Sequence, residues 1–378
     1  PSAGFLPLNF RNLQHARRTV LAFAVTYPIA AVVGVDDNSA LIAAGLAETL
    51  GLPHNSVESV AAARNKRRMR ELLRQHGVPA PQHTVFSVDE DAGEAAGKVR
   101  YPCVVKPLIL SASCGVIRAN NREEFAAAFQ RVGLLLERLG LRSRDEAGGS
   151  ILAEDFVPGQ EVALEGLLRH GELRVLALFD KPDPLNGPFF EETIYVTPSR
   201  RSSTTQAEIA ARAAEAAKAL GLQEGPIHGE FRVNDRGVWV IEMAARSIGG
   251  RCSRTLRFAT EMSLEELILR HALGMAMPAC ERERQAAGVM MLPIPRGGTL
   301  IETGGEADAF EEPGIEEVAI TAQPGDSLVP LPEGTRYLGF MIARADSPEA
   351  VEAALREAHR RLRFVIADAP QAAGSKTI

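Results

Sequence analysis

The chain has 378 residues and a formal net charge of -6; 46% of its residues are hydrophobic and 24% are charged. These values are typical of a soluble globular chain with two or three domains, and they exclude the basic footprint of a nucleic-acid-binding protein. The four cysteines are too few for a disulfide scaffold and too widely spaced for a CxxC site, which favours a reducing cytoplasm. No apolar run is long and uninterrupted enough to span a membrane, and no signal peptide is recognisable.

The first part of the chain alternates between helical and strand-like patterns. The periodicity predicts a helix over 13–26, a buried strand over 30–35 and a second helix over 39–50. This order of elements is typical of a doubly wound α/β sheet. Because the chain begins at Pro1 without a clear first strand, we expect that an N-terminal βα unit precedes it.

Asp36 and Asp37 stand directly after this predicted strand. Ligands gather beyond the carboxyl ends of strands in doubly wound sheets, so one interpretation places both aspartates in a substrate cleft. The interpretation that we favour is that they cap the helix that follows.

A basic helix, AAARNKRRMRELLRQH, is predicted over 61–76. A run of charges is most often a solvated face, and we interpret most of its arginines in this way. Further along, a predicted strand over 103–106 ends in Lys106 and leads into a loop of small residues, PLILSASCG. A lysine in this position suits the phosphates of a nucleotide, and backbone N–H groups of the loop, which contains Ser113 and Gly115, can close over them.

The sequence EDFVPGQEVALEG follows the next predicted strand. An adenine ring needs backbone donors and acceptors at a strand edge, together with apolar walls, and Glu154, Phe156 and Val157 offer both. Glu165 lies on the same face as Glu161 along this stretch, and we interpret Glu165 as a solvated strand residue.

Two runs of alternating polar and apolar residues flank the tripeptide DRG at 235–237. This pattern predicts a β-hairpin with a three-residue loop whose glycine has positive φ. Pairing Asn234 with Val238 then places Glu230 directly opposite Glu242. Facing carboxylates destabilise a sheet unless a cation lies between them, and their oxygens suit Mg²⁺ that also binds substrate phosphates. We interpret the pair as a metal clamp; the alternative, solvated glutamates on an exposed hairpin, is disfavoured by the apolar neighbours.

Arg246 and the pair Gly249-Gly250 follow the clamp within a few residues. The sequence EMAAR followed by SIGG resembles the ATP-grasp superfamily, and above all its L-amino acid ligase branch, whose members use ATP to join a carboxylate to an amine. The resemblance runs through most of the chain.

The resemblance implies a fold that combines α/β and α+β parts. The implied domains are a truncated doubly wound N-terminal domain over 1–62, a two-lobed ATP-grasp fold over 63–279 and a small C-terminal α+β lid over 280–378. The two ATP-grasp lobes would cover 63–150 and 151–279, with Lys66 and Lys106 in the first lobe and the metal clamp in the second.

Together with the residues above, the resemblance outlines a ligase site. Its ATP-binding residues would be Lys66, Lys106, Ser113, Gly115, Glu154, Phe156, Val157 and Glu161. Its Mg²⁺ ligands would be Glu230 and Glu242. Its catalytic residue would be Arg246, which would stabilise the charge that develops on an acyl phosphate. Its substrate-binding residues would be Glu192, Arg246, Ile248, Gly249 and Gly250.

Three of these assignments come from the resemblance alone. Lys66 matches the basic residue that reaches the ATP phosphates in the family, and Glu161 matches the acidic residue that binds the ribose hydroxyls. Glu192 lies in an irregular, proline-rich stretch over 181–200 and matches a carboxylate that holds a substrate ammonium, with Tyr195 as its neighbour.

The implied reaction is ATP-dependent formation of a dipeptide-like amide bond through an acyl phosphate, with release of ADP and phosphate. Its substrates would be a small-molecule carboxylate and amine, amino acids above all. The resemblance implies no nucleic-acid or membrane partner, and a homodimer is compatible with it.

Two other interpretations stay open. One is an ATP-grasp enzyme of the biotin-carboxylase-like or purine-pathway type. Many such enzymes carry an asparagine metal ligand where this chain has Ala244, and this difference counts against that interpretation. The L-amino acid ligase branch, in contrast, shows the same EMAAR-like sequence as this chain. The other is a non-catalytic nucleotide-binding module, which would lack an essential group, although Lys106, Glu230, Glu242 and Arg246 are all present.

Overall fold

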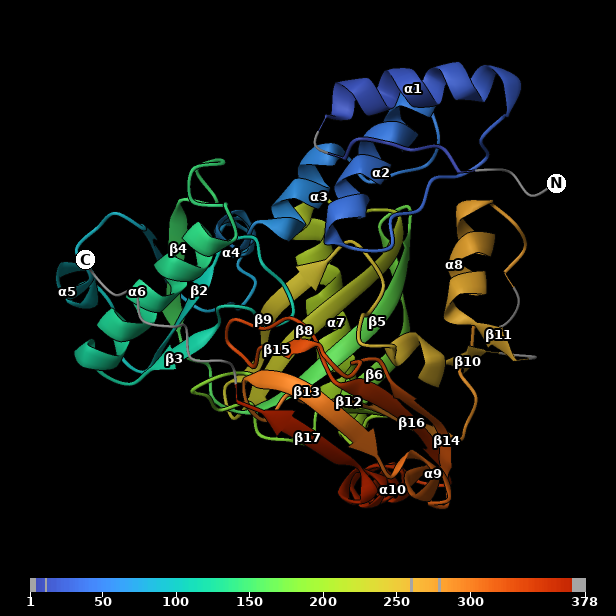
Figure 1. Ribbon diagram of the computed structural model, residues 1–378. Coiled ribbons are helices and arrows are strands. Elements are labelled where there is room, and N and C mark those ends of the chain that lie inside the picture. Colours follow the sequence, from blue (N-terminus) through green and yellow to red (C-terminus); the bar gives the residue numbers. More distant parts are fainter. Residues whose placement is uncertain (1–4, 11, 259–260, 278–279, 369–378) are drawn as a thin grey trace. The chain divides into compact units, whose positions relative to one another are not determined.

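The computed structural model describes residues 5–10, 12–258, 261–277 and 280–368. Contacts divide the chain into two compact units, and Figure 1 labels most of their helices and strands. The first unit takes its described residues from Pro1–Gln82, Val157–Phe179 and Arg201–Arg284; the second takes them from His83–Phe156, Asp180–Arg200 and Gln285–Ile378. The three domain boundaries expected from the sequence stay a prediction.

Helices make up the start of the first unit. They are α1 (Leu13–Thr26), α2 (Asp37–Leu50), α3 (Val57–Arg64) and α4 (Lys66–Gln75). Helices α1 and α2 pack together around Ala16, Val20, Ile42 and Leu46. The strand expected over 30–35 is wrong for the described chain, because its residues pair with no second strand there, and a strand forms only where a neighbour satisfies its N–H and C=O groups.

Helices α3 and α4 occupy the stretch where a single basic helix was expected. Asn65 separates them: its N–H donates to the Ala61 carbonyl of α3, and its side chain accepts from the Arg68 N–H of α4. The buried residues of α4 recur every three to four positions and therefore share one face; they are Lys66, Met69, Arg70 and Leu73. This face contains two cations, so not all of the basic side chains are solvated.

An antiparallel sheet forms the centre of the first unit. Its strands, in spatial order, are β6 (Glu172–Asp180), β5 (Gln160–Arg169), β8 (Gly225–Asn234) and β9 (Gly237–Ala244). Helix α7 (Ser203–Leu220) packs against this sheet, and its small residues, such as Ala213 and Ala216, allow close approach to Phe231 and Val240. The remaining elements of the unit are η1 (Cys252–Thr255), β10 (Arg257–Phe258), β11 (Met262–Ser263) and α8 (Leu264–Ala272).

The second unit begins with a four-stranded antiparallel sheet. Its strands, in spatial order, are β1 (His83–Ser87), β4 (Ser150–Asp155), β2 (Cys103–Pro107) and β3 (Ile117–Ala119). Helices α5 (Ala92–Ala96) and α6 (Arg122–Arg138) pack on it. Phe86, Phe125 and Phe129 form an aromatic cluster in this core, with ring centroids about 6 Å apart.

The rest of the second unit is a mixture of strands and helices, as the α+β part of the expected fold requires. One run of antiparallel strands is β14 (Ile315–Ile320), β16 (Gly339–Ala345), β12 (Ala286–Leu292) and β7 (Ile194–Thr197); the other is β15 (Ser327–Leu328), β13 (Gly298–Gly304) and β17 (Arg363–Ala367). Helices α9 (Glu306–Phe310) and α10 (Pro348–Arg361) contribute Ala309, Val351 and Leu355 to its core. None of the helices in the described ranges combines the length and apolar character of a membrane span.

Candidate active site

Glu230 on β8 lies directly opposite Glu242 on β9, as the alternation of the hairpin predicted. The loop and the pairing that produce this register differ from the expectation. Asn234 pairs with Gly237 rather than with Val238, so the loop is one residue shorter than predicted, although Gly237 has the expected positive φ of 109°. A β-bulge between Phe231 and Glu230 then shifts the register back by one residue.

The bulge leaves Ile241 as the extra residue of β9, and its carbonyl accepts a hydrogen bond of 2.6 Å from Arg70 Nη2. Arg70 is only 1% exposed, so it is an exception to the expectation that most arginines of this stretch are solvated. A bulge carbonyl has no ladder partner, and the guanidinium supplies one. Arg70 thereby fixes the backbone next to Glu242.

Lys66 is the first residue of α4, and its Nζ lies 3.5 Å from Glu242 Oε1. Its side chain is 6% exposed, whereas that of Glu242 is 27% exposed. The helix therefore brings a buried cation to one of the two clamp carboxylates. Its expected contact with ATP phosphates stays a prediction.

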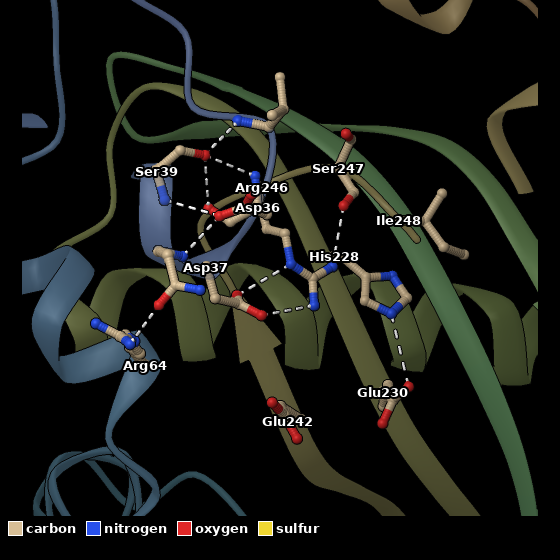
Figure 2. Close-up of polar contacts among 12 residues, drawn as sticks. Asp36, Asp37, Ser39, Arg64, His228, Glu230, Glu242, Arg246, Ser247 and Ile248 are labelled. Carbon is tan, nitrogen blue, oxygen red and sulfur yellow. Dashed lines mark hydrogen bonds and ion pairs between the residues drawn. The ribbon is translucent and has the colours of Figure 1, made fainter. Parts of the chain in front are cut away.

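Figure 2 shows Arg246 pointing toward Asp37, near the two glutamates. Arg246 Nε lies 3.0 Å from Asp37 Oδ1, and Arg246 Nη2 lies 3.2 Å from Asp37 Oδ2, so the contact is bidentate. Arg246 Nη1 donates to the Ser247 carbonyl at 3.0 Å. Burial opposes the charge of Arg246, yet the carboxylates of Asp37, Glu242 and Glu230 outweigh it and raise the pKa of the guanidinium.

Asp36 and Asp37 have different partners. Asp36 is the N-cap of α2, where its carboxylate accepts from the N–H groups of Asn38 and Ser39 at 2.8 and 2.7 Å, and the Ser39 N–H above all lowers its pKa. The capping interpretation is confirmed for Asp36. For Asp37 the capping interpretation is wrong, because its carboxylate binds Arg246. The two residues are 209 positions apart, and no local sequence pattern predicts a contact over that distance.

Glu165 is fully buried, so its interpretation as a solvated residue is wrong. On β5 it lies opposite His228 of β8, whose Nε2 is 3.6 Å from Glu230 Oε1 (Figure 2). A signal for this burial was present, because Glu165 stands in the apolar run VALEGLL.

In the second unit, Lys106 on β2 forms an ion pair with Glu154 on β4, and both side chains are buried. The two strands are neighbours, with Val104 opposite Glu154. Lys106, which was expected to bind the ATP phosphates, thus forms an ion pair with Glu154, which was expected to bind the adenine. Their contacts with ATP stay predictions.

The loop that follows β2 is held by hydrogen bonds within the second unit. Cys114 N–H donates to the Ser111 carbonyl at 3.2 Å and Gly115 N–H to the Pro332 carbonyl at 2.7 Å, so in this conformation both donors are used inside the protein. Ser113 and Gly115 have φ values of 54° and 73°. Burial raises the pKa of the Cys114 thiol to about 11, which agrees with a packing role for this cysteine.

Phe156 and Val157, the other two residues expected at the adenine, are held by protein contacts. Phe156 N–H donates to the Pro102 carbonyl at 3.1 Å, and the guanidinium of Arg118 lies 4.1 Å from the centre of the Phe156 ring. Val157 is buried. The adenine-binding role of both residues stays a prediction.

Glu161 and Glu192, expected at the ribose and at a substrate ammonium, each hold a cation of the protein. Glu161 Oε2 accepts from Arg232 Nε at 2.8 Å, across the β5 and β8 pair. Glu192 Oε1 accepts from Lys181 Nζ at 2.7 Å, and this ammonium also lies 4.8 Å from the centre of the Tyr195 ring. The carboxylate that was predicted to bind a substrate ammonium, that of Glu192, already binds the ammonium of Lys181.

The first unit also contains a cavity of about 170 Å³. His170 and His271 line it and both contact the Glu224 carboxylate, at 2.9 and 3.5 Å. None of the site residues predicted from the sequence lines this cavity, so it is not part of the predicted ligase site.

Two protein-family models match the chain. Residues 99–255 match the ATP-grasp domain, and residues 290–367 match L-amino acid ligase C-terminal domain 2. The second match lies within the region where the sequence predicted a C-terminal α+β domain.

Among the curated proteins and solved structures that are similar to the chain are a ligase, a synthase and one crystal structure. Alanine–anticapsin ligase of Bacillus subtilis (strain 168) is 26% identical over 235 residues, which cover 59% of this chain but only 49%, about half, of that protein. Dapdiamide A synthase of Enterobacter agglomerans is 25% identical over 352 residues, or 90% of this chain and 80% of that protein. The crystal structure of L-amino acid ligase from Bacillus licheniformis has a TM-score of 0.83 at 28% identity, and the match covers 95% of this chain and 87% of that one. These findings confirm the resemblance and the expected fold class: residues 99–255 of the chain match the ATP-grasp domain, and residues 290–367 match the C-terminal domain of the L-amino acid ligases.

Proposed function

We propose that this chain is an ATP-dependent ligase that joins a small-molecule carboxylate to an amine, forming an amide bond and releasing ADP and phosphate. The observation that carries the proposal is the pair of facing carboxylates, Glu230 and Glu242, with the cations Lys66 and Arg246 beside them. Phosphoryl transfer depends on positioning and charge neutralisation, and this cluster offers both anionic metal ligands and fixed positive charges.

The residues present fit Mg²⁺. Glu230 and Glu242 supply hard oxygen donors on neighbouring strands, and both side chains remain partly exposed, at 18% and 27%. We assign them as the residues that would hold the ion. Bound there, Mg²⁺ would neutralise charge on the phosphates of ATP.

The chain's own cations complete the charge balance. Lys66 is held by burial beside Glu242, so its ammonium is already desolvated and costs little reorganisation when a phosphate binds. Arg246 is oriented by Asp37, which leaves the guanidinium rigid near the two glutamates. We assign Arg246 to the charge that develops on the substrate carboxylate as it becomes an acyl phosphate.

Amino acids are the proposed substrates. Alanine–anticapsin ligase, dapdiamide A synthase and L-amino acid ligase support this class by their names. The match of residues 290–367 to the L-amino acid ligase C-terminal domain favours this branch over the biotin-carboxylase-like and purine-pathway enzymes.

The test is phosphate release from Mg·ATP with each amino acid singly and in pairs, with mass spectrometry of the products. We expect release that requires one particular pair, together with the mass of the corresponding amide. Release of phosphate that never needs an amine, with no amide formed, would overturn the proposal and favour a different ATP-grasp reaction.

A further inference from the structure

Glu165 is a buried acid that has no assigned role in the proposed ligase reaction. It lies on β5, a strand with neighbours on both sides, and its side chain is completely inaccessible to solvent. A buried carboxyl is costly unless its oxygens find partners, so its position calls for an explanation.

One oxygen of Glu165 has such a partner in the segment that follows Arg246. The Ile248 N–H donates to Glu165 Oε2 at 2.9 Å, and Ile248 is itself buried. The other oxygen, Oε1, has no hydrogen-bond partner among the residues that the structure describes. Burial raises the pKa of Glu165 well above its ordinary value, against the opposing effects of the Ile248 N–H and of Arg246, and this favours the neutral acid.

His228 lies between Glu165 and Glu230 of the metal clamp. Its Nδ1 lies 3.9 Å from Glu165 Oε2, and its Nε2 lies 3.6 Å from Glu230 Oε1. This row follows from the sheet, because Glu165 and His228 are register partners and His228 precedes Glu230 by two positions on the same face. Glu165, His228 and Glu230 therefore form one row of side chains, with the Ile248 N–H bound at one end and the Glu230 carboxylate at the other.

The backbone beyond Ile248 turns sharply. Gly250 has a φ of 61°, and Arg251, which is not a glycine, has a φ of 58°. Non-glycine residues in this region carry strain and persist only where their surroundings hold them. The hydrogen bond from Ile248 N–H to Glu165 is a restraint of this kind at the start of the turn.

We propose that Glu165 is a positioning residue that holds the backbone of residues 248–250 in register with Glu230, so that this backbone presents the substrate to the clamp. The inference rests on the proposed function, because it assigns residues 248–250 to the substrate side of the ligase site. Loss of the restraint should weaken amino-acid binding and catalysis and leave ATP binding in place.

Two substitutions test this role. Glu165→Gln keeps a neutral side chain with a carbonyl oxygen that can accept from Ile248 N–H, and we expect kinetic constants close to those of the wild type. Glu165→Leu fills a similar volume but removes the acceptor, and we expect kcat/KM for the amino acids to fall about 10- to 100-fold, the range for one unsatisfied buried donor. We expect the dissociation constant of ADP to change by less than about twofold, since no ATP-binding role is assigned to this loop.

Leu220→Ala, which opens the buried core beneath α7, is the control for loss of stability alone. If Glu165→Leu lowers the melting temperature as Leu220→Ala does but leaves KM and kcat unchanged, Glu165 is only structural and the inference is overturned. Equal damage in Glu165→Gln and Glu165→Leu would also overturn it.

Amide exchange at Ile248 gives a readout that does not depend on turnover. We expect faster exchange in Glu165→Leu than in Glu165→Gln, and equal exchange in the two variants contradicts the restraint. Absence of ligase activity in the wild type with every amino-acid pair would instead count against the proposed function, while the exchange result stands on its own.

Discussion

Arg246 and Asp37 form a bidentate ion pair that ties the residue beyond the metal clamp to the first turn of helix α2. The geometry matches the planar fork of a guanidinium, and the side chains are 16% and 27% exposed. Asp37 therefore sets the orientation of Arg246, and it gives Arg246 a partner other than Glu230 and Glu242.

Asp37→Asn should lower kcat. An asparagine has a single acceptor oxygen and carries no charge, so it cannot match both prongs of the guanidinium, and Arg246 becomes free to turn toward the two glutamates. We expect kcat to fall about 10- to 100-fold, as for loss of one charge-assisted positioning contact. Steady-state phosphate release under saturating substrates measures it.

Asp36→Ala is the matched control for this position. It removes the N-cap of the same helix, which should cost about 0.5–2 kcal/mol of stability without displacing Arg246. Wild-type kcat in Asp37→Asn, or an equal loss in Asp36→Ala, would show that Asp37 contributes only to the helix.

Glu242→Gln should abolish ATP-dependent phosphate release while the fold stays intact. The amide keeps the size of the side chain but removes the negative charge that suits a divalent cation. Mn²⁺ binding, followed by electron paramagnetic resonance with ADP present, should weaken in parallel. Asp235→Asn removes an exposed carboxylate from the turn of the same hairpin and should change neither phosphate release nor Mn²⁺ binding. Undiminished Mn²⁺ binding in Glu242→Gln would exclude Glu242 as a metal ligand.

Arg70→Met should destabilise the protein and disturb the clamp. Methionine preserves much of the buried volume but leaves the Ile241 carbonyl without its donor, at a cost of about 1–3 kcal/mol. Urea unfolding followed by circular dichroism measures the loss. Arg74→Met, at an exposed position of the same helix, should stay within about 0.5 kcal/mol of the wild type. Equal midpoints for the two variants would mean that the bulge does not depend on Arg70.

The facing pair of glutamates was predictable because strand alternation is local information. Glu230 and Glu242 are separated by a short turn, and the position of Gly237 marks that turn. The alternation did not reveal the bulge at Ile241, since bulges depend on a partner such as Arg70 from a distant helix. Here the shorter loop and the bulge compensated each other, so the predicted pair was right although the loop was wrong.

Burial was harder to predict than register. The alternation placed Glu165 on a face of its strand, but it does not say whether another part of the chain covers that face. Likewise, Lys66 and Arg70 look like members of a charged surface helix until their spacing with Met69 and Leu73 is considered. Asp37 had no local signal at all, because its partner Arg246 lies far along the chain.

Glu165 should make stability depend on pH with a sign opposite to that of a salt-bridged carboxylate. Its pKa in the folded state is raised above the ordinary value of 4.5 by burial. Below that value the group is protonated in both states and the full stability is present; as the pH rises, the unfolded state loses the proton first. The unfolded state then binds fewer protons, so stability falls with pH until the folded pKa is reached, by at most about 1.4 kcal/mol per pH unit.

Glu165→Gln cannot ionise and should lack this contribution. We expect the melting temperature of the wild type, relative to that of Glu165→Gln, to fall progressively as the pH is raised from 4.5 toward neutrality, because the other titrating groups are common to both proteins and cancel in the difference. Differential scanning calorimetry at matched ionic strength measures it. A difference that is constant over this range, or that grows in favour of the wild type, would mean that the carboxyl is charged in the folded protein and that its oxygens have polar partners beyond Ile248.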